Sequence, residues 1–461
     1  MPVQPVTVLR VRDAIPSCVF HFQGDTPAVQ QIVARLFAQQ TPARNAVQGV
    51  HTPRMQSSLA RAPAAAPVST VRMALLLSLG AAVSLGITRF AYGLLLPPMR
   101  DDLGWTYALA GAMNTSNAAG YLLGALLTPW LLQRLGAGSV LLTGSALASV
   151  LMAISGLFTD TTVWLLQRFA AGAASALVFM TGGLLAARLG AQDPARSGLL
   201  IGLYYGGTGV GISLSALLVP AVLHTAAGTA HAWAWGWAVM ALLCFAGTAM
   251  LRWPVQRLGA LAGAVNPGGG PVEALVPMRR LAYALGAYFM FGVGYIGYMT
   301  FIIALLKEHG YSAVGITAFY TLLGLAVIAS PRLWARLLDR HRDGRPLVLL
   351  NALLGLATLL PALSSAWPVV FASGLVFGAV FLSVVASTTA LVRHNLPGAQ
   401  WAAGIGAFTI VFAAGQIVGP TVVGWISDGA GGLERGLVVS ALALWLGSLL
   451  ATRQRAVALT A

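Results

Sequence analysis

Between Met73 and about Leu450 the chain consists of twelve apolar segments, one after another. Most are about 18–25 residues long, the length that a helix rising ~1.5 Å per residue needs to cross ~30 Å of hydrocarbon. Charged residues make up only 8% of the sequence, against about 25% in soluble proteins. We therefore predict an all-α polytopic membrane protein with spans near 73–97, 106–132, 138–158, 161–188, 197–223, 232–252, 281–306, 313–337, 346–363, 367–392, 401–426 and 435–451.

The net charge of +15 reflects membrane topology rather than nucleic-acid binding. Six arginines lie in the leader ahead of Arg72, Arg89 and Arg168 lie inside spans, and only Arg100, Lys307 and Arg435 flank one side of the spans. Positive charge marks the cytoplasmic side, so both termini are predicted to be cytoplasmic and nucleic acid is not an expected partner. The other, basic side carries Arg72, Arg134, Arg188, Arg196, Arg252, Arg257, Arg279, Arg280, Arg332, Arg336, Arg340, Arg342, Arg345, Arg393, Arg453 and Arg455.

The spans divide the chain into two bundles joined by a Pro/Gly-rich linker. We predict a poorly ordered leader over 1–72, six-helix bundles over 73–252 and 281–451, a cytoplasmic linker over 253–280, and a tail over 452–461. A short interfacial helix within the leader, and a translation start at Met55 or Met73, are left open. Cys18 and Cys244 are too few for a disulfide framework or a cysteine metal site.

An internal repeat relates the two bundles. Sliding the second half over the first at an offset of 206 residues aligns polar and glycine positions across six spans. An even number of spans before the linker keeps the two halves parallel, related by an axis along the membrane normal. The aligned pairs are Tyr92 with Tyr298, Gly104 with Gly310, Gly172 with Gly378 and, after a two-residue slip, Gly202 with Gly406 and Gly211 with Gly415.

The loop LLDRHRDGRP resembles the D-R-x-G-R-[RK] loop of the major facilitator superfamily (MFS), through Asp339, Arg340, Gly344 and Arg345. Its counterpart LLQRLGAGS keeps Arg134 and Gly136 but has Gln133 in place of the acid. In that superfamily the loop forms a charge latch between helices, so the resemblance implies a gating role for these residues. The missing acid implies that the first half has lost its ion pair.

Three further segments resemble the bacterial YbfB/YjiJ-type branch of this superfamily: GITRFAYGLLLPPM, GYIGYMTFIIALLKE and GQIVGPTVVGWISD. The resemblance covers residues 73 to about 450. It implies twelve transmembrane helices in two pseudo-symmetric halves, a bacterial inner-membrane location, and transport of a small solute by alternating access. It leaves the cargo open.

Two arginines inside the first half are the main candidates for a binding site. Arg89 lies eight residues before Pro97, or ~12 Å below the outer end of its span, and Arg168 lies at a comparable depth. A lone arginine at mid-bilayer depth costs at least ~2.5–3.5 kcal/mol, so both need compensation. Two readings stay open: they bind an anionic substrate, or they donate to helix-end carbonyls and to Asn114 and Asn117. Tyr92 belongs to the same region.

In the second half Tyr288, Tyr295 and Tyr298 share one stripe of the seventh predicted span. Phenols opposite two arginines suit a small organic anion with an apolar body, although an aromatic stripe also serves helix packing. Gln416 and Thr409 are weaker candidates. The run GGTGVG over 206–211 lies inside an apolar span, where close helix packing explains it better than phosphate binding.

None of the twelve acidic residues lies in the middle of a predicted span. The absence of a carboxylate from the middle of the predicted spans favours facilitated diffusion or exchange over proton symport. A membrane-embedded enzyme would need an acid/base pair, a nucleophile or a metal cluster, and no such set is visible, so we predict no enzyme, cofactor or metal. We expect a monomer in the lipid bilayer that binds a small-molecule substrate; a transporter-like sensor remains an alternative.

Overall fold

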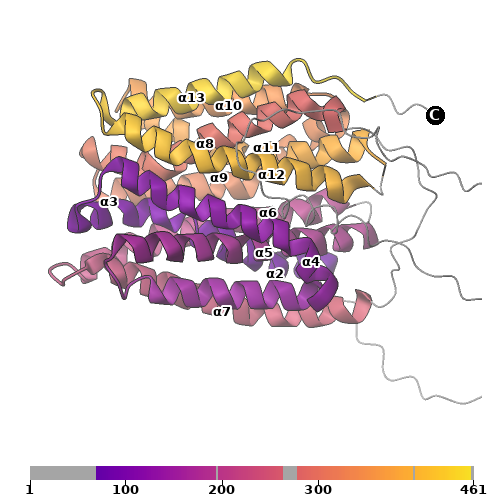
Figure 1. The fold of residues 1–461 in the computed structure, drawn as a ribbon, viewed down its shortest axis with the longest axis horizontal. Helices are drawn as coiled ribbons and strands as arrows, with labels where there is room; N and C mark the ends of the chain where they lie inside the picture. Colours follow the sequence, from indigo (N-terminus) through magenta and orange to yellow (C-terminus); the bar gives the residue numbers. More distant parts are fainter. Residues whose placement is uncertain (1–68, 194–195, 263–277, 398–399, 458–461) are drawn as a thin grey trace, which may run out of the picture. The chain divides into compact units, whose positions relative to one another are not determined.

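The computed structural model describes residues 69–193, 196–262, 278–397 and 400–457. Every regular element in these ranges is helical (Figure 1). Predictions about residues 1–68, 263–277 of the linker and 458–461 lie outside the described residues. The elements are α2 (Thr70–Ala81), η1 (Ala82–Ile87), α3 (Ala91–Leu103), α4 (Tyr107–Ile154), α5 (Thr161–Gln192), α6 (Ser197–Thr225), α7 (Ala232–Ala262), η3 (Met278–Leu281), α8 (Ala282–Glu308), α9 (Ala313–Arg340), α10 (Arg345–Leu363), α11 (Trp367–Asn395), α12 (Trp401–Ser427) and α13 (Gly432–Ala451).

Eleven helical segments of the described chain are long and apolar enough to cross a membrane. One of them, α4, has 48 residues, which at ~1.5 Å per residue is about 72 Å, more than twice the hydrocarbon thickness. At Gly136 the backbone leaves helical geometry, with φ 74° and ψ 157°, so α4 consists of two helices joined at a sharp bend. This bend accounts for the difference from the twelve predicted spans, two of which end and begin on either side of it.

The first span is not one continuous α-helix. The π-helix η1 follows α2, and the amides of Thr88 and Phe90 donate to carbonyls five residues earlier, at Val83 (3.0 Å) and Leu85 (3.0 Å). The helix resumes as α3 at Ala91. Wide turns of this kind free carbonyl groups of the backbone for other donors. Arg89 therefore lies at a break in the middle of its span.

The two halves, α2 to α7 and α8 to α13, meet along two equivalent pairs of helices. The first part of α4 packs against α12, and α6 packs against α9. The 206-residue offset places the first part of α4 on α9 and α6 on α12, so one contact is the repeat counterpart of the other. This arrangement agrees with the predicted duplication. The sixth helix, α7, continues to Ala262, beyond the predicted boundary at 252, because Val255 and Leu258 are buried.

The glycine run over 206–211 allows α6 to approach its neighbours closely, as predicted. A Cβ added at Gly211 would lie 2.6 Å from the carbonyl oxygen of Ala82 and 2.7 Å from the Cα of Gly86. Both contacts are backbone atoms of the first span, which have little room to shift. The packing interpretation of this run is therefore confirmed.

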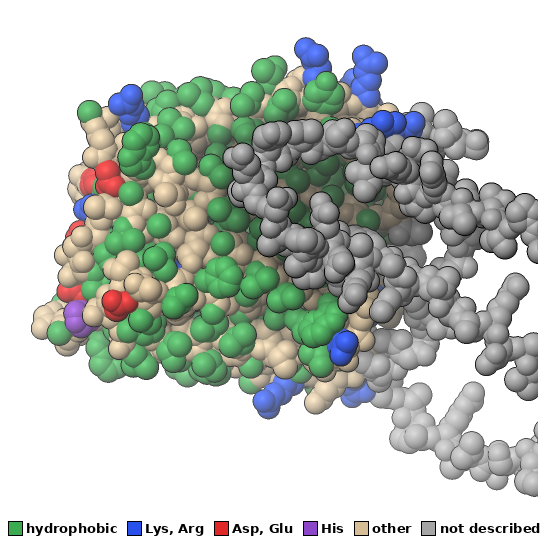
Figure 2. Space-filling view, in the orientation of Figure 1, with side chains coloured by type: hydrophobic (Ala, Val, Ile, Leu, Met, Phe, Trp, Pro, Cys, Tyr) green, Lys and Arg blue, Asp and Glu red, His purple; other side chains and the backbone are tan. Residues whose placement is uncertain are grey.

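The charged residues gather at opposite ends of the helices. We call the end with Arg134, Arg188, Arg340 and Arg393 the basic end; the acidic end carries Asp101, Asp102, Glu308, Asp428 and Glu434. Figure 2 shows acidic side chains at the left end, most Lys and Arg side chains toward the right, and hydrophobic side chains between them. Such an apolar band between two polar ends is expected of helices that cross a bilayer.

We expect Gly211→Ala to lower the thermal stability of the protein, because the added methyl group overlaps backbone atoms of the first span. Overpacking of this kind costs about 1–3 kcal/mol. The matched control is Gly198→Ala on the same helix, where an added Cβ meets nothing within 4 Å. Melting of both purified variants checks the prediction, and equal melting temperatures would contradict it.

Candidate functional site

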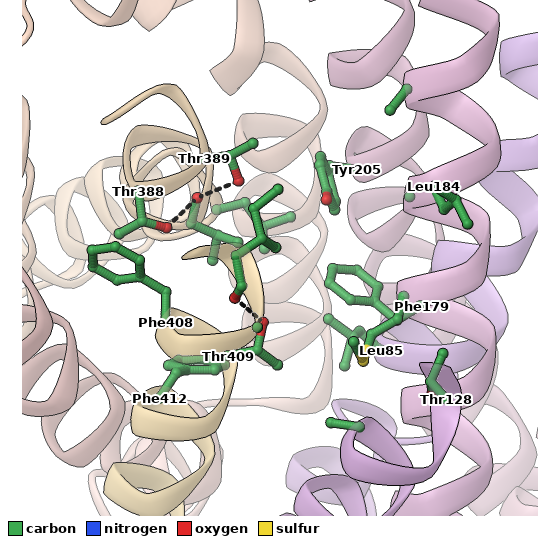
Figure 3. A pocket seen from close by; sticks show the side chains of 18 of the residues that line it. Leu85, Thr128, Phe179, Leu184, Tyr205, Thr388, Thr389, Phe408, Thr409 and Phe412 are labelled. Atoms are coloured by element: carbon green, nitrogen blue, oxygen red, sulfur yellow. Dashed lines mark hydrogen bonds between the residues drawn. The ribbon is translucent and has the colours of Figure 1, made fainter. Parts of the chain in front are cut away.

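A cavity of about 700 Å³ lies between the two halves. Its wall runs from Arg89 and Tyr295, in the middle of their spans, to Ser197, Arg393 and Trp401 at the basic end. Its lining includes no residue of the helix ends at the acidic end. The cavity therefore opens toward the basic end. Figure 3 shows that both halves contribute to it, with Leu85, Thr128, Phe179, Leu184 and Tyr205 facing Thr388, Thr389, Phe408, Thr409 and Phe412.

One side of the cavity is a cluster of aromatic rings, which we call the aromatic wall: Tyr288, Phe291 and Tyr295 of α8 with Phe408 and Phe412 of α12. The rings of Phe291 and Tyr295 stack with centroids 4.7 Å apart, and those of Tyr288 and Phe412 with centroids 5.0 Å apart. Stacked rings form a rigid apolar surface with few rotatable bonds. This surface suits the apolar body of a small molecule.

Arg89 brings positive charge to the closed end of the cavity. Its side chain is only 2% exposed, its Nη2 contacts Oε1 of Gln416 in the other half, and its guanidinium lies 5.8 Å from the centre of the Tyr121 ring. Its Nε has no hydrogen-bond partner among the described residues. Among the residues that the structure describes, Arg89 and Arg393 are the only charged side chains that line the cavity. The electrostatic character of the wall is therefore positive.

Arg168 lies behind the cavity and joins the broken first span to α4 and α5. Its Nη1 donates to the carbonyl oxygen of Thr88 (3.1 Å) and its Nη2 to Oδ1 of Asn114 (3.3 Å). Its guanidinium also lies 4.9 Å from the centre of the Tyr92 ring. Thr88 belongs to the break, so Arg168 takes up a carbonyl group that the π-helix leaves free. The side chain is fully buried.

The remaining predicted residues divide into two sets. Tyr288, Tyr295 and Thr409 line the cavity, whereas Tyr92, Asn114, Asn117, Tyr298 and Gln416 are buried outside its lining. The amide of Asn114 donates to Thr300 of the other half (2.8 Å), and that of Asn117 donates to the carbonyl oxygen of Arg168 (3.0 Å).

The two tyrosines of the buried set, Tyr92 and Tyr298, contact neighbouring helices. The hydroxyl of Tyr92 donates to the carbonyl oxygen of Ala110 (2.9 Å). Tyr298 stacks on Phe377 with centroids 4.0 Å apart and lies 2.7 Å from the hydroxyl of Ser373. Both phenols are thus directed at neighbouring helices.

Sequence reasoning missed several residues of the cavity wall. Tyr121 lies four residues after Asn117 and seven after Asn114, so it shares a helix face with them, and this spacing is the signal that could have found it. Phe408 and Phe412 lie four residues apart and so share a helix face, a pattern that the sequence displays. Phe291 lies three residues after Tyr288 and four before Tyr295, so it also shares their helix face. No comparable signal marks other missed residues, which include Phe179, Tyr205, Phe381, Thr388, Thr389, Arg393 and Trp401.

The predicted gating loops lie at the basic end, where the cavity is open. Gly136 forms the bend of α4, and Arg134 lies with its guanidinium 5.1 Å from the centre of the Trp130 ring. In the second half Arg345 pairs with Asp343 (3.3 Å). The other loop residues are Asp339 and Arg340, which end α9, and Gly344, whose amide donates to the carbonyl oxygen of Gln454 (3.0 Å).

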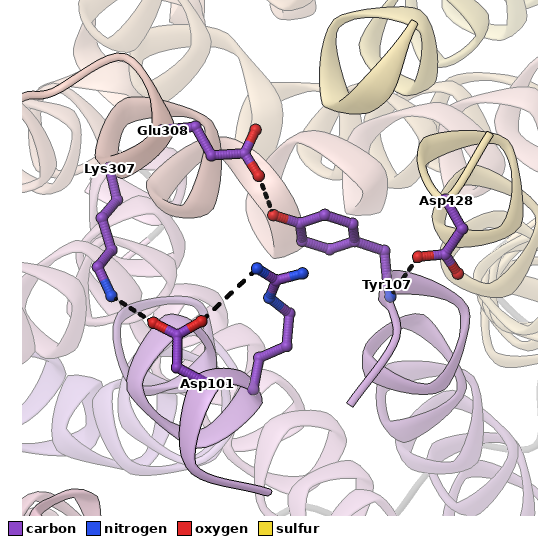
Figure 4. A network of polar contacts seen from close by, with 6 residues as sticks. Asp101, Tyr107, Lys307, Glu308 and Asp428 are labelled. Carbon is purple, nitrogen blue, oxygen red and sulfur yellow. Dashed lines mark hydrogen bonds and ion pairs between the residues drawn. The ribbon is translucent and has the colours of Figure 1, made fainter. Parts of the chain in front are cut away.

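At the acidic end a network of polar contacts closes the space between the halves (Figure 4). Lys307 pairs with Asp101 (2.7 Å), and the hydroxyl of Tyr107 donates to Glu308. The carboxylate of Asp428 accepts from the amide of Tyr107 (2.7 Å), in the first turn of α4. We call these contacts the acidic-end clasp. Each of them joins one half to the other.

Comparison with known proteins identifies the family. Residues 81–452 match the model of the family described as "Uncharacterised MFS-type transporter YbfB". The chain belongs to this family. The resemblance inferred from its sequence motifs is thereby confirmed, and the protein is an MFS transporter with a small-molecule substrate.

A curated relative of this MFS transporter is a protein of Agrobacterium vitis described as "Putative tartrate transporter". The two are 27% identical over 213 residues, a match that covers 43% of this chain and 44% of the relative. The chain thus spans less than half the length of that relative in the match.

Solved structures with the same fold include the nucleoside transporter NupG, with 14% identity and a TM-score of 0.61 over 84% of this chain and 99% of that chain. Another is a bacterial homologue of the human lysosomal transporter Spinster, in an inward-facing and occupied conformation. It has 15% identity and a TM-score of 0.60, over 84% of this chain and 97% of that chain. At such identities the likeness shows the MFS fold alone.

We expect Arg168→Gln to destabilise the MFS transporter in the absence of any ligand. The shorter side chain leaves the Thr88 carbonyl and the Asn114 side chain without their donor, and a buried unsatisfied polar group costs about 1–3 kcal/mol. The control is Arg188→Gln on the same helix, where the arginine is exposed. Melting curves of the two variants should separate; coincident curves would show that Arg168 does not hold the break.

Tyr107→Phe should shift the transporter toward a state that is open at the acidic end, because it removes one contact of the clasp. A net loss of about 1 kcal/mol changes the ratio of the two states about fivefold. Spin labels at Thr229 and Ala430, one in each half at the acidic end, would report the distance distribution in a chain with Cys18→Ser. Tyr311→Phe is the control, since that hydroxyl donates to Ser365 within its own half; an unchanged distribution for Tyr107→Phe would contradict a role in closure.

Proposed function

We propose that the transporter carries a small organic anion with an apolar body, and that Arg89 binds its charged group. The observation that carries this proposal is the charge of the cavity wall, whose only charged residues in the described part of the chain are Arg89 and Arg393. A guanidinium binds a carboxylate through paired hydrogen bonds. Arg89 is partly unsatisfied at Nε, so it has a donor to offer. The aromatic wall then accommodates the apolar part of the anion.

In this proposal the predicted residues have two kinds of role. Arg89, Tyr288 and Tyr295 contact the substrate from the cavity wall, and Gln416 holds Arg89 in place until the anion arrives. A second group, behind the cavity, fixes the positions of the first: Tyr92, Asn114, Asn117, Arg168 and Tyr298.

The contact between Arg89 and Gln416 links substrate binding to the relation between the halves. Arg89 belongs to the first half and Gln416 to the second. An anion that takes the guanidinium competes with the neutral amide oxygen for the same donors, and charge-assisted hydrogen bonds are the stronger ones. Binding therefore exchanges a contact between the halves for a contact with substrate, which is how occupancy alters the balance between conformations.

We propose that the basic end faces the bacterial cytoplasm and that the described conformation is inward-facing in the inner membrane. The excess of arginine at that end supports this orientation, and it places both termini in the cytoplasm. The acidic-end clasp then closes the outer side. In the outward-facing state the clasp separates, and the loops with Arg134, Gly136, Asp339, Arg340, Gly344 and Arg345 come together as the inner latch.

The transport mode that fits this site is facilitated diffusion or anion exchange by a monomer. No carboxylate or histidine of the described ranges lines the cavity, so this wall offers no group of the kind that usually carries a coupling proton. One chain encloses the whole cavity, so a monomer contains a complete site. The description of the Agrobacterium vitis relative as a "Putative tartrate transporter" also supports an anionic substrate, because tartrate is an anion.

The test is a thermal-shift screen of the purified transporter against acidic, neutral and cationic metabolites. We expect carboxylates to raise the melting temperature, and Arg89→Gln to abolish this increase while the ligand-free melting temperature stays within a few degrees. Loss of one charge-assisted contact of about 1.5–3 kcal/mol weakens binding about 10- to 100-fold.

The matched control is Arg72→Gln, which removes an exposed arginine from the same span and outside the cavity. It should bind carboxylates as the unmodified transporter does. Stabilisation by cations alone would exclude the anion proposal. A ligand-free Arg89→Gln protein that fails to fold would assign Arg89 a structural role instead.

A further inference from the structure

The two seams between the halves differ at the basic end. Along α6 and α9 the contact is continuous: a Cβ at Gly324 would lie 2.8 Å from the carbonyl oxygen of Gly209, and a Cβ at Gly202 would lie 2.6 Å from the Cβ of Pro331. No described residue of α9 lines the cavity. This seam is therefore closed as far as the basic end.

The seam between α4 and α12 is tight only near the acidic end. Thr115 donates to the carbonyl oxygen of Ile417 (2.7 Å), and a Cβ at Gly111 would overlap the backbone of Pro420. Farther toward the basic end the two helices face the cavity and no longer pack against each other. The residues that do so are Ala125, Leu126, Thr128, Pro129 and Leu132 of α4 and Ile405, Gly406, Phe408, Thr409, Ile410 and Phe412 of α12.

Some apolar side chains at this seam are exposed although they line the cavity. Leu126 is 54% exposed and Ile410 is 41% exposed, whereas Tyr288 and Tyr295 on the aromatic wall are 3% and 2% exposed. A Cβ added at Gly406 would meet nothing within 4 Å. The repeat sharpens the contrast, because Gly406 is the counterpart of Gly202, which packs on Pro331. Equivalent glycines thus face a closed seam in one place and open space in the other.

We propose that the gap between α4 and α12 is a lateral portal from the cavity to the bilayer. We further propose that the substrate is a single-chain anionic amphiphile whose hydrocarbon chain lies in this portal. This inference rests on the proposed function, because it assigns the charged group of the amphiphile to Arg89. It narrows the substrate class from organic anions in general to anions that dissolve in the membrane through one alkyl chain.

The chemistry of the surfaces supports this occupant. The portal is bordered by Leu126, Ile405 and Ile410, so a hydrocarbon chain passes through it without desolvating polar groups. The charged group then reaches Arg89, where it gains the paired hydrogen bonds that lipid tails cannot supply. A fully polar solute would leave the apolar border in contact with water, which is unfavourable.

The experiment uses full-length transporter in lipid nanodiscs and two probes, butanoate and a dodecanoate with a photoreactive diazirine at the end of its chain. We expect illumination to attach the dodecanoate to the portal helices, at residues 125–132 of α4 and 405–412 of α12, and not to α9. Excess butanoate and the Arg89→Gln substitution should each reduce this labelling about tenfold, since both remove the anchoring charge contact.

A second variant tests the portal itself. Gly406→Leu fills the open space and should lower labelling by the dodecanoate about tenfold, whereas Gly198→Leu adds the same side chain to an exposed, unoccupied position of α6 and should not. Equal labelling of the α4–α12 and α6–α9 seams, labelling insensitive to Arg89→Gln, or labelling unaffected by Gly406→Leu would each overturn the portal.

These outcomes separate the two proposals. If butanoate stabilises the transporter through Arg89 but the dodecanoate does not label α4 and α12, the portal is wrong and the anion site stands. If neither carboxylate binds, the proposed function itself fails.

Discussion

The site depends on two buried guanidinium groups whose hydrogen-bond partners are neutral. Arg168 donates to a backbone carbonyl and an asparagine, and Arg89 contacts a glutamine; both lie near tyrosine rings. Neutral acceptors provide hydrogen bonds but do not cancel charge, and charge in a medium of low dielectric constant is expensive. The break in the first span lowers the cost of burying Arg168, because it leaves the Thr88 carbonyl free to accept a hydrogen bond from the guanidinium. Arg89, at the same break, faces the cavity instead.

The contacts between the halves are suited to repeated separation. The clasp consists of an ion pair with both side chains about half exposed, a phenol–carboxylate contact and an aspartate at the first turn of α4. An exposed ion pair contributes only about 0–1 kcal/mol to stability. Together these contacts stabilise the conformation that is closed at the acidic end, yet they can separate when the transporter changes state. Tight glycine contacts between the halves lie on the helix pairs α4–α12 and α6–α9, which can rock against one another.

The sequence predicted the elements of this fold well because its strongest signals are local. The length of each apolar segment indicates a membrane span. The glycine run over 206–211 indicates close helix packing without showing which helix is the partner. The break over 82–90 carries no such signal. Gly86 is one of 53 glycines in the chain, so it does not mark a break. Whether a π-turn forms depends on the side chains that pack against it. The contact of Arg89 with Gln416, 327 residues away, is tertiary and has no counterpart in local pattern.

The tyrosine stripe of α8 shows how far periodicity reaches. Tyr288 and Tyr295 are seven residues apart, which returns them to nearly the same face, and both line the cavity. Tyr298 is rotated by about 60° from Tyr295, enough to turn it onto Phe377 and Ser373. Residues that the sequence places on one helix stripe therefore do not all line the same cavity.

Duplication provides the scaffold, and departures from it provide the chemistry. The repeat offset pairs Arg89 with Tyr295, and both line the same cavity from opposite halves. A symmetric ancestor would place the same residue on both walls; here one wall supplies charge and the other an aromatic face. The same logic applies to Gly202 and Gly406, one packed on Pro331 and the other open. For the amphiphile proposed above, two equivalent positions with unlike surroundings would orient its unlike ends, since a charged group and an apolar chain each have only one favourable direction in which to lie.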